Sequence, residues 1–105
     1  MSKRSRTKIE QSKHDRVVRR LANELKDKGW CVRADVKGYP RPYTVGYKKP
    51  KRPDIYARKG SKEIIIEVET DSSIGTKRTF IQDQKFKRWK RAKPKTRQYR
   101  LILVD

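Results

Sequence analysis

Residues 63–71 form an acidic and apolar stretch in a chain that is otherwise strongly basic. The stretch reads E-I-I-I-E-V-E-T-D and holds four of the chain's twelve acidic residues, without a lysine or arginine. A run of three isoleucines is typical of a strand that is buried in a sheet. Because carboxylates on a buried strand are costly unless they are paired or bind a cation, the stretch predicts a central strand that carries a polar site.

A hairpin brings one more acid to this strand. Residues 54–57 have the pattern of a short strand. Gly60-Ser61 suits a two-residue type II′ turn that connects this strand to the next. Counting back from the turn places Asp54 opposite Glu67 in the sheet.

The two-residue period of a strand divides the side chains of residues 63–69 between two faces. Glu67 and Glu69 share the face of Asp54. Glu63 lies on that face too, but close to the turn, so we expect it to be solvated. The opposite face carries the apolar residues Ile64, Ile66 and Val68.

Three carboxylates that converge on one side of a sheet predict a metal site. Carboxylates at short distance repel one another, and a divalent cation between them removes the repulsion. Mg²⁺ and Mn²⁺ prefer oxygen ligands and can activate water against a phosphodiester. The alternative is a set of strand-end acids that pair with nearby lysine or arginine side chains. We interpret Asp54, Glu67 and Glu69 as metal ligands.

Two helices and two further strands complete an α/β pattern. Apolar residues recur at helical spacing from about residue 10 or 12 to residue 28, and a second helix is expected over residues 77–92. Residues 30–36 and 99–104 read as strands, and the latter looks fully buried at its end. The order of elements is therefore helix, three strands, helix, strand.

The length of 105 residues fits one small domain. We expect this domain to span residues 10–105, after a basic flexible arm at residues 1–9. Cys31 is the only cysteine, which excludes a disulfide framework, and we expect it to be a small core residue. No stretch has the pattern of a membrane span or a signal peptide, so a cytoplasmic, nucleoid-associated protein is expected.

The first helix carries the chain's one histidine. His14 lies three and four residues before Val17 and Val18, so it continues the apolar stripe of the helix and points toward whatever the helix packs on. The N-cap of this helix is expected near Ser12 or Gln11.

The basic composition points to a polyanionic partner. The net charge is +19 and the isoelectric point about 10.5, which favours nucleic acid over a merely charged surface. Residues 37–52, here called the basic loop, interleave three tyrosines with cations. They suit either a surface that grips phosphates and bases or a loop that its tyrosines fasten to its own domain. The expected nucleic-acid contacts are Lys37, Arg41, Lys48, Lys49, Lys51, Arg52, Arg78, Lys87 and Arg88.

The chain resembles the PD-(D/E)xK nuclease superfamily, which includes restriction endonucleases and archaeal Holliday-junction resolvases. The resemblance lies in Pro53-Asp54, in Glu67-Val68-Glu69 after the isoleucines, and in the order of elements. It implies a mixed central sheet flanked by helices. It also implies that Asp54 and Glu67 bind Mg²⁺ or Mn²⁺ and that the backbone carbonyl of Val68 reaches the metal.

One position departs from the family pattern, because Glu69 stands where the family has lysine. The resemblance implies that Glu69 then acts as a metal ligand or general base, or that a lysine from a neighbouring element replaces the missing one. Lys85 of the second helix is the candidate. The family also places an acid or other polar residue of the first helix near the metal. Glu10 and His14 are available, and His14 is preferred because it is nearer the centre of the apolar stripe. Gln82 is expected to orient substrate or water.

The sequence thus predicts a Mg²⁺- or Mn²⁺-dependent endodeoxyribonuclease, with duplex, branched or nicked DNA as substrate. A homodimer is expected if both strands of a duplex are cut. One alternative is a nucleic-acid-binding protein with a silent nuclease site. Another is a basic protein that associates with RNA or the ribosome.

Overall fold

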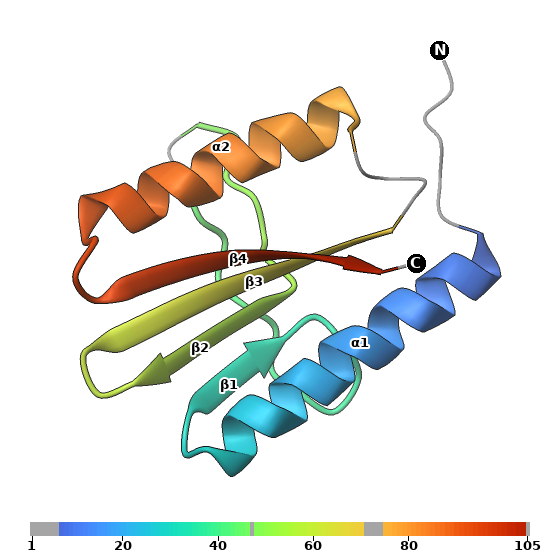
Figure 1. The fold of residues 1–105 in the computed structure, drawn as a ribbon, viewed down its shortest axis with the longest axis horizontal. Helices are drawn as coiled ribbons and strands as arrows, with labels where there is room; N and C mark the ends of the chain where they lie inside the picture. The colour runs from blue at the N-terminus through green and yellow to red at the C-terminus, as the bar shows by residue number, and fades with distance from the viewer. Residues whose placement is uncertain (1–6, 47, 71–74, 105) are drawn as a thin grey trace.

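The computed structural model describes residues 7–46, 48–70 and 75–104 of the chain. It confirms the α/β fold and the predicted order of helix, three strands, helix and strand (Figure 1). The second helix has the predicted bounds, whereas the strands differ from the expected ranges by at most two residues at their ends. The elements are α1 (Lys8–Asp27), β1 (Cys31–Ala34), β2 (Ile55–Lys59), β3 (Lys62–Thr70), α2 (Lys77–Ala92) and β4 (Arg97–Val104).

The four strands form one mixed sheet in the order β1-β2-β3-β4. The first three are antiparallel, and β4 runs parallel to β3. Lys59 pairs with Lys62 across the turn, as the sequence predicts. Gly60 has a φ of +60°, which a residue without a Cβ adopts without strain at the first position of a type II′ turn.

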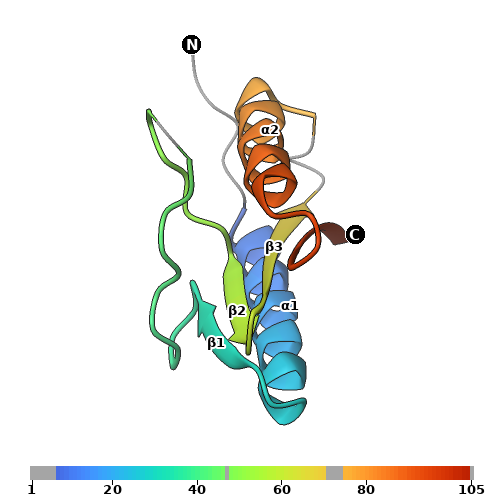
Figure 2. The same cartoon turned by 90° about the vertical axis from the view of Figure 1, so that its left-hand side faces the viewer.

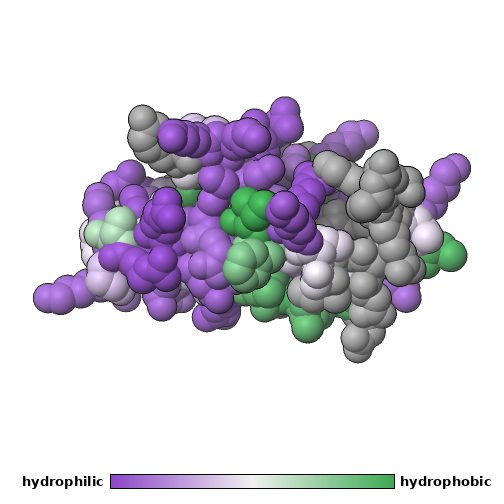
Figure 3. All heavy atoms as spheres, turned by 90° about the horizontal axis from the view of Figure 1, so that it is seen from above, coloured by the Kyte–Doolittle hydropathy of each residue, from purple (hydrophilic) through white to green (hydrophobic). Residues whose placement is uncertain are grey.

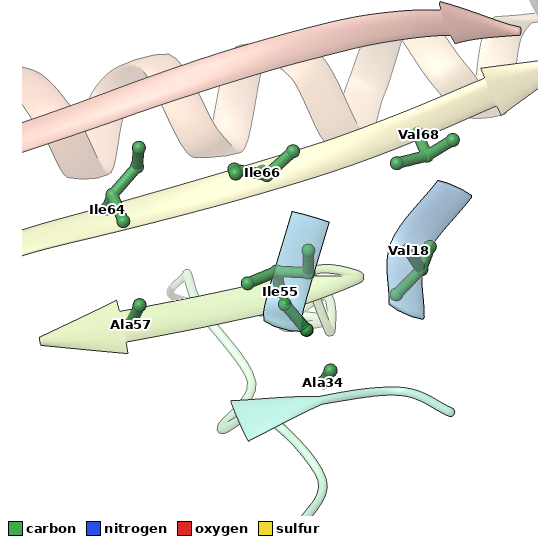
Figure 4. Close-up of a cluster of buried hydrophobic side chains, with 8 residues drawn as sticks. Val18, Ala34, Ile55, Ala57, Ile64, Ile66 and Val68 are labelled. Carbon is green, nitrogen blue, oxygen red and sulfur yellow. The ribbon is translucent and has the colours of Figure 1, made fainter. Parts of the chain in front are cut away.

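One face of the sheet forms the core with α1. Ile64, Ile66 and Val68 of β3 pack with Ile55 of β2 and with Val18 of α1. Figure 4 shows these side chains gathered between strands and helix, with α2 behind the sheet. The predicted division of β3 into two faces is therefore confirmed. The carboxylates of Glu67 and Glu69 lie on the opposite face of β3.

The second face of the sheet is covered from two directions. The ring of Phe86 in α2 lies 5.5 Å from the ring of Tyr99 in β4. Apart from Tyr39, which contacts α1, the described part of the basic loop lies on the side of the sheet away from α1 (Figure 2), where the rings of Tyr43 and Tyr56 meet edge to face at 6.1 Å. The carboxylate-bearing face thus lies on the side of the sheet that meets α2 and the basic loop.

Helix α1 begins earlier than the sequence analysis expects. Its N-cap is Thr7, whose hydroxyl accepts from the N–H of Glu10 at 3.1 Å while the Glu10 carboxylate accepts from the N–H of Thr7 at 3.2 Å. This capping box satisfies two backbone donors at once, so Ser12 and Gln11 lie inside the helix. Residues 8 and 9 of the expected arm are helical, and residues 1–6 lie outside the described part of the chain.

Two expectations about burial are wrong. Cys31 is exposed, because Val32 and Ala34 take the core side of β1 and the strand alternation turns Cys31 outward. The end of β4 is not fully buried, since Leu101 and Leu103 are both exposed. As the last strand of the sheet, β4 has a strand neighbour on one side only among the described residues.

The basic loop is fastened to its own domain at several points. The hydroxyl of Tyr39 donates to Asn23 of α1. The guanidinium of Arg33 in β1 lies over the ring of Tyr43 at 4.2 Å and donates to the carbonyl of Arg41 at 3.1 Å. For Tyr39 and Tyr43, the structure therefore favours the interpretation that the tyrosines hold the loop to the domain. Tyr47 lies outside the described residues.

Candidate functional site

Asp54 and Glu67 are locked together by two hydrogen bonds. The N–H of Asp54 donates to Oε1 of Glu67 at 3.0 Å, and the N–H of Val68 donates to Oδ2 of Asp54 at 2.7 Å. The hairpin register, which pairs Ile55 with Ile66, sets this arrangement. The predicted opposition of the two acids is confirmed, and each bond fixes the rotamer of one carboxylate.

Glu67 and Glu69 are both buried on the face of β3 opposite the α1 core. Burial raises the pKa of Glu67 well above its ordinary value, and the negative charges of Asp54 and Glu69 raise it further. In the absence of a cation, Glu67 therefore keeps its proton at neutral pH. The name "carboxylate site" is used below for Asp54, Glu67 and Glu69.

His14 reaches the same site from α1. It lies on the buried line of the helix with Val18 and Ala22, as its spacing predicts. Its Nε2 lies 3.2 Å from Oδ2 of Asp54, and its Nδ1 lies 3.0 Å from Oδ1 of Asp15. The structure thus brings His14 to the acid that the sequence analysis singled out, whereas Glu10 is engaged at the helix N-cap.

The residues present fit a divalent cation in their chemistry. One oxygen of each locked carboxylate accepts from the backbone, and a side-chain hydrogen bond brings the two carboxyl groups together. A carboxyl pair that retains a proton is an arrangement in which a cation can take the proton's place. Within the described ranges of the chain, no group of three or more His, Cys, Asp or Glu side chains is gathered tightly enough to hold a metal. Asp54 and Glu67 are therefore the pair of side chains that fits a cation, and Glu69 lies two residues further along β3.

The two candidate residues on α2 are placed differently from the carboxylates. The ammonium of Lys85 donates to the carbonyl of Lys48 at 2.9 Å, and its methylenes lie against Gly46, where an added Cβ would come within 3.4 Å. Lys85 therefore joins α2 to the basic loop. Gln82 is half-buried on the same helix. The catalytic roles of both remain predictions.

Most of the predicted nucleic-acid contacts are exposed. The exceptions are Lys51 and Arg52, which are half-buried. Lys48 and Lys49 have φ values of 52° and 48°, so the turn that displays them has a left-handed backbone that such residues adopt infrequently. The exposed members of the set are Lys37, Arg41, Lys48, Lys49, Arg78, Lys87 and Arg88.

Glu63 is not solvated, which corrects the expectation from its place near the turn. Its carboxylate accepts from the hydroxyl of Tyr56 at 2.6 Å and from Nε of Arg97 at 3.0 Å. The parallel pairing of β3 with β4 places Glu63 beside Arg97, and no local pattern in the sequence signals this. Asp15 was also missed, although its position next to His14 was a usable signal.

Comparisons with protein-family models, with curated proteins and with solved structures gave no match. None of the helices in the described part of the chain is both long and apolar enough to cross a membrane.

Proposed function

We propose that this chain is a metal-dependent endodeoxyribonuclease of the PD-(D/E)xK type that hydrolyses phosphodiester bonds. The observation that carries the proposal is the locked pair of Asp54 and Glu67, with Glu69 beside it, buried in a chain of net charge +19. A structural role would not require two buried acids on one face of the central strand with Asp54 hydrogen-bonded beside them, because burial of carboxylates opposes folding.

In this proposal Asp54 and Glu67 hold Mg²⁺ or Mn²⁺, together with the carbonyl of Val68, and Glu69 lies two residues further along β3. When bound, the cation polarises the phosphodiester and lowers the pKa of the attacking water. Asp54 directly precedes β2, and its side chain is 16% exposed. The scissile phosphate therefore reaches the carboxylate site past Asp54. Glu69 accepts the proton of the attacking water.

The DNA backbone would lie along the side of the sheet away from α1. The basic loop and α2 both meet this side, and they carry exposed cations at Lys48, Lys49, Lys87 and Arg88. Phosphate contacts of this kind hold the duplex or branch without reading its sequence. A protein of this kind would act in the nucleoid of the cytoplasm.

One observation favours a second candidate, a non-catalytic nucleic-acid-binding protein. Glu69 stands where the family has lysine, and the nearest replacement candidate, Lys85, contacts the carbonyl of Lys48 in the basic loop. Without a lysine at the site, the fold and the basic surface would bind DNA without cleaving it.

A cleavage assay separates the two candidates. Labelled duplex, nicked and junction DNA are incubated with the protein and Mg²⁺ or Mn²⁺, and the thermal midpoint is measured with and without Mn²⁺. The nuclease is expected to cut at least one substrate and to gain thermal stability with metal, because a ligand that binds only the folded state stabilises it. DNA binding without cleavage by either metal would support the non-catalytic candidate instead.

A homodimer is part of the proposal, because one carboxylate site cuts one strand at a time. Figure 3 shows an apolar patch among hydrophilic side chains on one face of the molecule. The exposed large apolar residues of α2 and β4 are Phe80, Ile81, Leu101 and Leu103. The outer edge of β4 has no strand partner in the described sheet, and strand edges of this kind pair with a second chain.

The variant Leu103→Lys is therefore expected to weaken the dimer. Leu103 is 62% exposed, and loss of its burial against a second copy would cost about 1.5–3 kcal/mol, or at least about tenfold in the dissociation constant. Sedimentation velocity over a range of concentrations measures this. Ile9→Lys, at an exposed position of α1, is the control. A wild type that stays monomeric at every concentration, or equal effects of both variants, would refute an interface at β4.

A further inference from the structure

A line of polar contacts runs from the surface of α1 to the carboxylate site. The amide Nε2 of Gln11 donates to Oδ1 of Asp15 at 2.8 Å. The same Oδ1 lies 3.0 Å from Nδ1 of His14, and Nε2 of His14 lies 3.2 Å from Oδ2 of Asp54. Four side chains thus connect the outside of the helix with the acid at the start of β2.

The side chains become more buried along this line, from the surface of α1 as far as His14. The side chain of Asp15 is 41% exposed, whereas that of His14 is 4% exposed. The helical spacing explains the arrangement, since Gln11 lies one turn before Asp15 and His14 lies on the buried side with Val18. An imidazole at this depth cannot exchange its partners for water, so its neighbours determine its orientation.

The chemistry of the contacts assigns a role to each ring nitrogen. An ionised carboxylate only accepts hydrogen bonds, and Gln11 already donates to Oδ1 of Asp15. At the contact between Asp15 and His14, the ring must therefore donate from Nδ1. Nε2 faces a second carboxylate, Oδ2 of Asp54, which by the same rule is an acceptor while it is ionised.

The position of Asp15 does not suit an ordinary helix-capping role. The acidic residue in the first turn of α1 is Glu10, which completes the capping box with Thr7. Asp15 lies two turns into the helix, where interaction with the helix dipole is weak. Its contacts with Gln11 and His14 give a more specific explanation for a carboxylate at this place.

We propose that Asp15 is a positioning residue of the carboxylate site, which acts through His14. It keeps the proton on Nδ1 and fixes the ring plane, so that Nε2 stays against Oδ2 of Asp54, while Gln11 holds Asp15 in turn. Carboxylates that orient a histidine in this way influence a metal site without touching the metal. The consequence for metal binding rests on the proposed nuclease function, whereas the consequence for the histidine does not.

The single histidine makes a direct test feasible. In ¹⁵N-labelled, metal-free protein at neutral pH, a long-range ¹H–¹⁵N spectrum reports which ring nitrogen carries a proton. Wild-type Nδ1 is expected to resonate as a protonated nitrogen. In Asp15→Asn and Asp15→Ala, its signal is expected to move toward the unprotonated position. Backbone amide signals of the sheet show that the variants are folded.

The control is Asp27→Asn, the same substitution at an exposed position of the same helix. It removes the same charge and is expected to leave the signals of His14 unchanged. A Nδ1 signal that is the same in wild type and in both Asp15 variants would overturn the proposal. An equal shift in Asp27→Asn would also overturn it, because the effect would then follow from net charge.

Calorimetric titration with Mn²⁺ provides a second measurement. Asp15→Asn is expected to weaken Mn²⁺ binding by about tenfold or more, and Asp27→Asn to leave it unchanged. Unaltered affinity in Asp15→Asn would refute a link between Asp15 and the metal. A wild type that binds no Mn²⁺ would count against the proposed function, and the spectrum of His14 would still decide the role of Asp15.

Discussion

Glu67→Gln is expected to abolish metal-dependent cleavage and, at the same time, to stabilise the metal-free protein at neutral and basic pH. Glutamine keeps the shape of the side chain and can accept from the N–H of Asp54, as Oε1 of Glu67 does at 3.0 Å. It cannot supply a charge to a cation. Since a bound cation contributes several kcal/mol to the transition state, the expected loss of activity is at least about 1,000-fold.

The gain in stability follows from the raised pKa of Glu67. Its folded-state pKa lies above the ordinary value of 4.5 because of burial and of the Asp54 charge. Between these two pKa values, the folded chain keeps the proton and the unfolded chain releases it. The free energy of unfolding therefore falls as the pH rises, by up to about 1.4 kcal/mol per pH unit. Glutamine has no proton to lose, so this fall is absent in the variant.

Urea unfolding of both proteins at about pH 5 and about pH 8, without metal, measures the difference. The advantage of Glu67→Gln is expected to grow with pH. Glu24→Gln, the same change on the exposed side of α1, is expected to alter neither cleavage nor the pH dependence. Cleavage by Glu67→Gln at the wild-type rate would remove Glu67 from the metal site. Parallel stability curves would show that its pKa is not raised.

Local signals were sufficient to predict the hairpin and its faces. The turn at Gly60-Ser61 fixes the register, and the register alone brings Asp54 opposite Glu67. The period of the strand then assigns each side chain of β3 to a face. The approach of His14 to Asp54 was expected only from the family resemblance, because α1 packs on the isoleucine face of β3 and the carboxylates were assigned to the opposite face.

The parts that sequence reasoning missed depend on contacts between distant segments. Glu63 meets Arg97 only because β4 pairs in parallel with β3. Lys85 approaches Lys48 because the basic loop folds back over the sheet toward α2. The start of α1 is a different case, since Thr7 and Glu10 have the spacing of a capping box. That signal was present in the sequence, but the weaker candidates Ser12 and Gln11 were preferred.

Phe86→Ala is expected to be the most destabilising substitution in α2. Phe86 is a fully buried aromatic residue, and its ring packs on Tyr99 at 5.5 Å. The side chains around it on α2 are mostly basic, so little other apolar area holds this helix to the sheet. Truncation of a buried phenylalanine costs about 3–5 kcal/mol, which is a large share of the roughly 5–15 kcal/mol that stabilises a domain.

Phe80→Ala is the matched control, since it removes the same ring from the same helix at a position that is 63% exposed. In the monomeric protein, its effect on the free energy of unfolding is expected to stay within about 0.5 kcal/mol. Urea unfolding followed by circular dichroism measures both variants. Because Tyr99 also donates to Asp83 of α2 at 2.7 Å, a small loss in Phe86→Ala would mean that this hydrogen bond, rather than the aromatic contact, anchors α2. Equal losses in both variants would mean that the exposed ring of Phe80 is buried in solution, as contact with a second copy of the chain would require.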